Sequence, residues 1–117
     1  MLARANRVVL PADFRATVRR GRRATTASAV YYRLATDPAA PARFGVVVSK
    51  AVGNAVVRNR VRRRLKALGR GRIDAGHRGE DVVIRVLPGS AQGSWDSLSA
   101  DMDAVIPAPQ AGNSPTA

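Results

Sequence analysis

The segment from residue 55 to residue 68 constrains this chain most, because its apolar and basic residues separate onto two faces of a helix. Val57, Val61, Leu65 and Leu68 recur at helical spacing, and at about 100° per residue they span roughly 80°. The rest of the segment carries basic and amide side chains and no acid: Arg58, Asn59, Arg60, Arg62, Arg63, Arg64 and Lys66. We therefore predict a helix over 55–68, capped by Asn54 and ended by Gly69, that buries a narrow stripe and exposes a cationic face.

The cationic face predicts a polyanionic partner. Like charges four residues apart, as in Arg58, Arg62 and Lys66, repel each other by a few tenths of a kcal/mol, so an external anion should offset them. Guanidinium groups bind phosphate through a planar fork, and a formal net charge of +12 adds long-range attraction. The alternatives are a merely solvated basic face and a membrane-surface helix. The second is disfavoured, because the stripe lacks Trp and Phe and is needed for the protein's own core.

The remaining patterns predict three strands and two more helices. Pro11 and Gly21 bracket a helix over 11–20, and residues 29–36 alternate as a strand. The apolar runs 44–49 and 81–87 read as buried strands, and we expect 29–36 to pair with 44–49 through the loop between them. Ser94 is a candidate cap for a last helix. Its inward stripe is expected to be Trp95, Leu98, Met102 and Val105.

This order of elements predicts an α+β two-layer sandwich in which one sheet buries a face under the helices. The length suits one domain, which we place at 1–106, with 107–117 as a disordered tail because it is small, polar and proline-containing. The longest apolar runs are far below the roughly 20 residues of a spanning helix, and no secretory signal is visible. We therefore expect a cytoplasmic protein with no membrane partner.

No catalytic or metal site is predicted in the protein itself. His77 is the only histidine, cysteine is absent, and we interpret His77 as a solvated loop residue between glycines. The acids are scattered, with no paired spacing of the kind that two-metal phosphoryl chemistry uses. The chain therefore has the composition of a binding protein, not of an autonomous hydrolase.

One stretch resembles a known signature. It reads Ser49-Lys50-Ala51-Val52-Gly53-Asn54-Ala55-Val56-Val57-Arg58-Asn59-Arg60-Val61-Arg62-Arg63 and is similar to the motif of the bacterial ribonuclease P protein family. The resemblance extends from about Arg7 to Ile106. It implies a mostly antiparallel sheet of about four strands, with an extra short strand inside 22–27. It also implies that the basic helix lies in a left-handed crossover connection, against the usual right-handed preference.

The resemblance also implies a division of labour with RNA. The ribonuclease P RNA subunit would hold the catalytic Mg²⁺, and the protein would bind that RNA and the precursor transfer RNA, with no protein partner implied. The RNA-subunit surface would comprise Ser49, Lys50, Asn54, Arg58, Asn59, Arg60, Arg62, Arg63 and Lys66. The 5′ leader would enter a cleft between the first helix and the sheet, at Phe14, Val18 and Tyr32.

The leader residues have a simpler interpretation as well. Aromatic rings stack on any base, but Phe14 and Tyr32 would be read as ordinary core residues without the resemblance. Position 18 is often aromatic in the family and is Val18 here, so one stacking platform is missing.

Two rival functions remain at this point. A ribosomal RNA-binding protein would share the composition and the fold class, but it has no need for the signature from Ser49 to Arg63. An autonomous nuclease lacks the side chains it would need.

Overall fold

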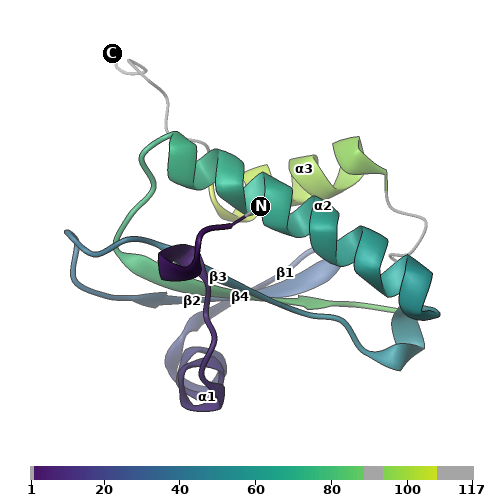
Figure 1. The fold of residues 1–117 in the computed structure, drawn as a ribbon, viewed down its shortest axis with the longest axis horizontal. Helices are drawn as coiled ribbons and strands as arrows, with labels where there is room; N and C mark the ends of the chain where they lie inside the picture. The colour runs from purple at the N-terminus through teal and green to yellow at the C-terminus, as the bar shows by residue number, and fades with distance from the viewer. Residues whose placement is uncertain (1, 89–93, 108–117) are drawn as a thin grey trace.

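The structure is a computed structural model that describes residues 2–88 and 94–107, and it has the predicted mixed α+β class (Figure 1). Apart from Pro107, the expected tail over 107–117 lies outside the described residues. In chain order the elements are η1 Arg4–Asn6, α1 Pro11–Arg20, β1 Arg22–Thr25, β2 Ala29–Ala35, β3 Arg43–Val47, η2 Lys50–Val52, α2 Ala55–Asp74, β4 Glu80–Val86 and α3 Trp95–Val105. The extra strand expected inside 22–27 is present as β1. None of the helices described is long and apolar enough to cross a membrane.

The four strands form one sheet in the order β1-β2-β4-β3. β1 pairs with β2 and β2 with β4 in antiparallel fashion, whereas β3 and β4 are parallel. The sheet is therefore mostly antiparallel, as expected, and α2 lies in the crossover from β3 to β4, which a parallel pair requires. The expected pairing of 29–36 with 44–49 is wrong, because β4 lies between these strands. β4 carries fully buried Val82, Val83 and Ile84, which explains its central place.

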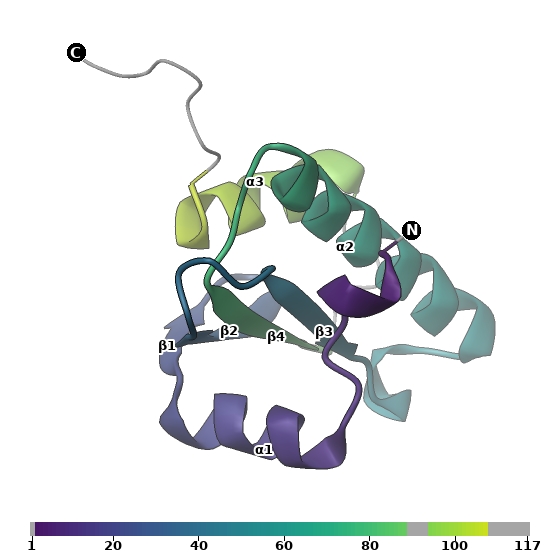
Figure 2. The ribbon, with the colours of Figure 1, turned by 60° about the vertical axis from the view of Figure 1, so that its left-hand side comes forward.

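Helices cover both faces of the sheet, not the single face that the sequence predicted. Figures 1 and 2 show α2 and α3 on one side of the sheet and α1 alone on the other. Tyr31 and Ile84 belong to the large core under α2 and α3, while Tyr32 and Val83 form a smaller core with Phe14 of α1. Neighbouring strand residues point to opposite faces, so apolar runs in β2 and β4 leave both faces in need of cover.

Helix α2 is longer than the sequence predicted. Asn54 caps it as expected, with the Val57 N–H donating to Asn54 Oδ1 at 3.0 Å. The predicted end at Gly69 is wrong, because the helix continues to Asp74. A Cβ on Gly69 would lie 3.1 Å from Cγ of Phe44, so this glycine lets the helix approach β3 closely. Glycine therefore serves packing at this position and not termination.

Helix α3 begins as predicted, and three of its four predicted inward residues, Leu98, Met102 and Val105, pack in or against the main core. The Ser97 N–H donates to Ser94 Oγ at 3.1 Å, which confirms the cap. Leu98 and Met102 are fully buried, and Ile106, one residue beyond the helix, continues their four-residue repeat into the core. Trp95 is 45% exposed, so its place in the predicted inward stripe is wrong.

The lone histidine is also not the solvated loop residue that the sequence suggested. His77 Nε2 lies 2.5 Å from Glu80 Oε2, and its ring is tilted against Phe44 at a centroid distance of 6.3 Å. Arg33 donates two hydrogen bonds to the same carboxylate, at 2.9 and 3.1 Å, and a third to the Val105 carbonyl. Burial alone would raise the pKa of Glu80, but the hydrogen bonds from His77 and Arg33 outweigh it and hold that pKa below its usual range. These contacts tie the chain after α2 to the sheet and to α3.

Candidate nucleic-acid interface

The buried stripe of α2 determines which of its residues face outward. Val61, Leu65 and Leu68 are buried in the main core. The intervening basic residues are therefore exposed or half-buried on the outer side of the helix, as the sequence predicted. No acidic residue occurs in the sequence between Asp37 and Asp74, so this surface has no acid on its own helix before the last turn. We call the outward residues of α2, together with the segment from Ser49 to Asn54 before it, the α2 basic surface.

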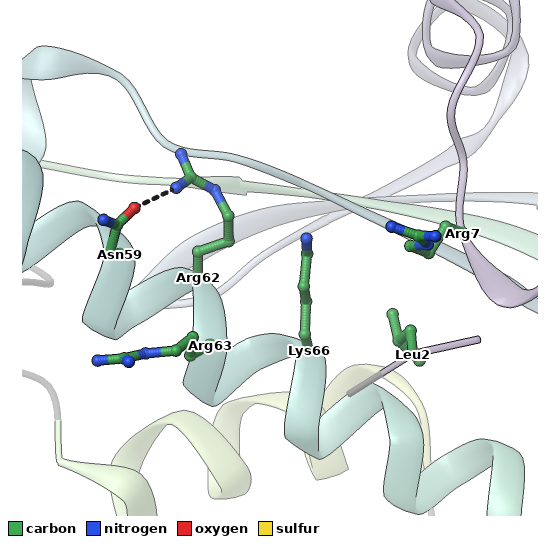
Figure 3. Close-up of a pocket in the computed structure, with 6 residues that line it drawn as sticks. All are labelled: Leu2, Arg7, Asn59, Arg62, Arg63 and Lys66. Atoms are coloured by element: carbon green, nitrogen blue, oxygen red, sulfur yellow. Dashed lines mark hydrogen bonds between the residues drawn. The ribbon is translucent and has the colours of Figure 1, made fainter. Parts of the chain in front are cut away.

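A pocket of about 480 Å³ lies on this surface. Its lining residues are Leu2, Arg7, Asn59, Arg62, Arg63 and Lys66 (Figure 3). Arg62 donates to Asn59 Oδ1 at 2.8 Å, which orients its guanidinium. In Figure 3 the Lys66 ammonium points into the space between Arg62 and Arg7, whereas Arg63 extends away from them. The pocket therefore gathers cations from two chain segments that are far apart in sequence.

Arg7 is a member of the pocket that the sequence did not reveal. It reaches the surface because the N-terminal segment runs along β3: Arg7 forms a parallel bridge with Phe44, and the Val8 N–H donates to the Phe44 carbonyl at 3.1 Å. Leu2, which is buried, anchors the start of that segment. A single arginine in an irregular segment gives no periodic signal, so only the tertiary contact identifies it.

The cationic side chains of the pocket repel one another. Partial burial lowers the pKa of Lys66, and the positive charges of Arg62 and Arg7 lower it further. A bound anion would reverse the effect of those charges. The pocket is thus electrostatically suited to a phosphate or another anionic group.

The other predicted residues of this surface are distributed around the pocket. Lys50 and Asn54 are exposed at the start of α2, where the Asn54 side chain serves as the cap. Arg58 donates to the Gly53 carbonyl at 3.2 Å, and Arg60 is exposed without lining the pocket. Ser49 lies instead on a second groove, described next. The predicted set therefore forms a broad surface with one concave centre.

A groove of about 540 Å³ lies on the opposite face of the sheet, beside α1. Its lining includes Val18 and Tyr32, two of the three residues predicted to contact a leader, and the floor continues to Val47. A smaller hollow of about 350 Å³ shares Val18 and Val47 and includes Phe14. We call the two hollows together the α1 groove. The structure thus brings Phe14, Val18 and Tyr32 to one side of the molecule.

The aromatic rings of this groove are largely withdrawn into the protein. Tyr32 is only 7% exposed and packs with Val30 and Val83. Phe14 lies against β3 so closely that a Cβ on Gly45 would be 2.6 Å from its ring. Arg43 fixes α1 in this position by contacting Asp13 at 3.3 Å while holding Asp81 with two donors. Val18, at 41% exposure, is more accessible than either aromatic residue.

Several acids of the protein bind basic side chains within the fold. Asp13 and Asp81 bind Arg43, Asp103 binds Arg72, and Glu80 binds Arg33 and His77. Within residues 2–88 and 94–107, no group of three or more His, Cys, Asp or Glu side chains could hold a metal ion. The carboxylates of Asp13, Glu80, Asp81 and Asp103 are therefore engaged by basic side chains and are not free to coordinate Mg²⁺.

Comparison with known proteins gives one consistent family over most of the chain. The model of the family described as Ribonuclease P matches residues 2–108. The chain is 53% identical over 106 residues to the ribonuclease P protein component of Clavibacter michiganensis, covering 91% of this chain and 94% of that one. It is 46% identical over 114 residues to the ribonuclease P protein component of Streptomyces avermitilis, with coverages of 91% and 93%.

Solved structures share the fold at lower identity. The RNase P protein of Staphylococcus aureus superposes with a TM-score of 0.76 at 22% identity, covering 87% of this chain and 93% of that one. The RNase P protein of Thermotoga maritima gives a TM-score of 0.74 at 18% identity, with coverages of 85% and 93%. The strand order and helix placement described above are therefore those of a known fold.

Proposed function

The chain belongs to the ribonuclease P protein family, and from this premise we propose that its α2 basic surface binds the ribonuclease P RNA subunit. Proteins of this family are components of a ribonucleoprotein endonuclease that acts in transfer RNA processing, so an RNA partner is part of the function. The ribosomal alternative does not agree with the family. The observation that carries the proposal is the pocket in which Arg7, Arg62 and Lys66 converge without an acid among its lining residues. Such a site favours phosphate, the group that RNA presents at every nucleotide.

We further propose that the α1 groove receives the 5′ leader of precursor transfer RNA. The groove lies on the face of the sheet opposite the α2 basic surface and is joined to it at Ser49, next to Lys50 and η2. One protein could therefore hold the catalytic RNA on one face and the substrate's single strand on the other. Phe14, Val18 and Tyr32 are the proposed contacts.

Cleavage itself is proposed to depend on Mg²⁺ held mainly by the RNA subunit. Asp13, Glu80, Asp81 and Asp103 are each bound by an arginine, which supports a role for the protein in binding and positioning RNA. We place this work in the cytoplasm, with no further protein partner.

Reconstitution tests the proposal. The purified, RNA-free protein should leave precursor transfer RNA intact in Mg²⁺, and the holoenzyme should cleave it at a lower Mg²⁺ concentration than the RNA subunit alone.

Arg62→Ala with Lys66→Ala should weaken RNA-subunit binding by at least about tenfold, because charged hydrogen bonds to phosphate are lost. Arg22→Ala with Arg78→Ala is the matched control, since both residues are exposed and line neither surface. Equal losses in the two double variants would contradict the assignment of the α2 basic surface. Cleavage by the protein alone, abolished by replacing one acid, would support a nuclease instead.

A further inference from the structure

Two arginines of the α1 groove have no assigned role. Arg23 and Arg85 line the groove together with Val18 and Tyr32. Both are exposed, and within residues 2–88 and 94–107 neither side chain makes a hydrogen bond or an ion pair. Arginines elsewhere in the sheet behave differently: Arg33 and Arg43 are each held by a carboxylate. Arg23 and Arg85 are therefore available to an external anion.

Arg85 occupies an unusual place for a charged residue. It belongs to β4, a central strand of the sheet, and it is the one exposed residue of that strand. Its direct neighbours across the sheet are Val30 of β2 and Val47 of β3. An apolar side chain at this point would extend the smaller core, but arginine places a charge on the floor of the groove where α1 leaves the sheet uncovered.

Strand pairing places the two arginines on the same face. Arg23 is opposite Tyr32, and Arg85 is opposite Val30, two residues earlier on the same strand. Because alternate residues of β2 share a face, both arginines project on the side of α1. Their Cα atoms are two strands and two residues apart, roughly 12 Å from strand spacing and rise. The two guanidinium groups can therefore engage different phosphates of one strand.

Among the described residues, no acid lines the groove together with this pair. Asp81 lies on the same face of β4 but is bound at 2.7 Å by Arg43, which also contacts Asp13. Seating an uncharged protein segment here would leave two guanidinium groups desolvated without partners, which is costly. A single-stranded polyanion complements both the charge and the apolar floor.

We propose that Arg23 and Arg85 form a two-point clamp on phosphates of the 5′ leader, so that this protein recognises the leader by its backbone more than by its bases. The inference rests on the proposed function of the α1 groove and adds residues and a mode of recognition to it. The aromatic rings of the groove are largely withdrawn, and its accessible floor at Val18 and Val47 is aliphatic. Stacking therefore contributes less here, and phosphate contacts contribute more.

The test uses holoenzyme reconstituted with Arg23→Gln/Arg85→Gln protein, which keeps much of each side-chain stem. Affinity for precursor transfer RNA should fall by at least about tenfold at moderate salt, as expected for lost charged hydrogen bonds. The dependence of log affinity on log salt should become shallower by roughly 1.4, at about 0.7 per single-strand phosphate. Arg23→Lys/Arg85→Lys should recover part of the loss. Arg22→Gln is the control, because it neighbours Arg23 and is exposed but projects from the other face of β1.

A precursor whose leader consists of abasic nucleotides separates backbone from base recognition. The clamp predicts that the glutamine variant loses as much affinity for this substrate as for the natural precursor. Mature transfer RNA and the RNA subunit should bind the variant and the parent equally, which also shows that the variant is folded. An unchanged precursor affinity, or an equal loss for precursor and mature transfer RNA, overturns the clamp.

Failure of the proposed function is distinguishable from failure of the clamp. If the unsubstituted protein gives the holoenzyme no preference for precursor over mature transfer RNA, leader binding itself is wrong, and the clamp falls with it. If that preference is present and the glutamine variant retains it, only the clamp is wrong.

Discussion

The lowered pKa of Lys66 reflects the crowding of positive charges on the α2 basic surface. Burial and the charges of Arg62 and Arg7 lower its pKa, so the charged form of Lys66 is less favourable in the folded protein than in the unfolded chain. Between the lowered pKa and the ordinary value of 10.5, the unfolded chain binds more protons. The free energy of unfolding therefore rises as the pH rises through that window.

We predict that Lys66→Met is more stable than the parent at neutral pH, by a few tenths of a kcal/mol, because it removes like-charge repulsion. The difference should shrink as the pH rises through the lowered pKa towards 10.5, where Lys66 loses its charge in both states. Urea unfolding at a series of pH values measures it. A difference that stays constant across this range would contradict the electrostatic explanation. RNA-subunit affinity should fall in the same variant.

Glu80 gives the opposite dependence on pH. Its pKa is held below the ordinary value of 4.5 despite burial, because His77 and Arg33 donate to the carboxylate. The stability that it contributes is fully present above pH 4.5 and is lost as the pH falls through the lowered pKa.

We predict that Glu80→Gln lowers the free energy of unfolding by about 2 kcal/mol at pH 7, since His77 and Arg33 lose a charged acceptor. The gap between variant and parent should narrow below pH 4.5, as the parent's carboxyl becomes protonated. Thermal unfolding followed by circular dichroism from pH 3 to 7 is the measurement. A gap of the same size at both ends of the range would show that charge is not the cause.

At the scale of elements, two glycines in α2 have different roles. Gly69 is buried against Phe44, whereas a Cβ on Gly71 would meet nothing within 4 Å. Glycine costs roughly 1 kcal/mol relative to alanine inside a helix, so each replacement offers the same gain in helix propensity.

We predict that Gly71→Ala raises the free energy of unfolding by about 0.5 to 1 kcal/mol. Gly69→Ala should lower it by about 1 kcal/mol, because Phe44 is only 1% exposed and has no room to yield. Denaturant unfolding of the two variants side by side provides the comparison. Equal stabilisation by both changes would mean that α2 and β3 are not closely packed at this point.

Helix α1 carries the exposed position at which an aromatic ring is missing from the groove. Val18 is more accessible than Phe14 or Tyr32. We predict that Val18→Phe strengthens holoenzyme binding to precursor transfer RNA by roughly 1 kcal/mol, about fivefold, because it adds a surface on which a base can stack. The gain should vanish with an abasic leader and with mature transfer RNA. A gain that persists with those ligands would indicate a general apolar effect. Phe14→Ala and Tyr32→Ala are poorer tests, because both rings also belong to the smaller core.

For the molecule as a whole, arginines and a lysine line hollows on both faces of the sheet, and the formal net charge is +12. Figure 2 shows the sheet between α2, which carries the α2 basic surface, and α1. The α1 groove, with Arg23 and Arg85 in its lining, is on the side of α1. Long-range attraction should therefore steer RNA to both faces, and salt should weaken both contacts.

We predict that affinity for the RNA subunit falls on the order of 1,000-fold between roughly 50 and 200 mM salt, if about six phosphates are contacted. Arg62→Ala should reduce the slope of log affinity against log salt by about one unit, whereas Arg85→Ala should leave it unchanged. Filter binding at several salt concentrations gives both slopes. Identical slopes for the two variants would mean that RNA-subunit binding is not confined to the α2 basic surface.

Elements that depend on local periodicity and capping could be predicted from the amino-acid sequence alone. The helix over 11–20, the Asn54 and Ser94 caps, the buried stripe of α2 and its basic outer surface all follow from spacing along the chain. The signature from Ser49 to Arg63 indicated the protein family by its resemblance to a known motif. These features are local because a helix or a strand repeats its environment every few residues.

Contacts between segments far apart in the sequence became known only from the folded structure. β4 separates β2 from β3, α1 covers the face opposite α2, and Gly69 continues a helix because Phe44 packs against it. Arg7, Arg23 and Arg85 enter their sites through strand pairing or through docking of the N-terminal segment. Such contacts depend on burial shared between residues far apart in the chain. The periodicity of one segment does not indicate which distant segment will pack against it.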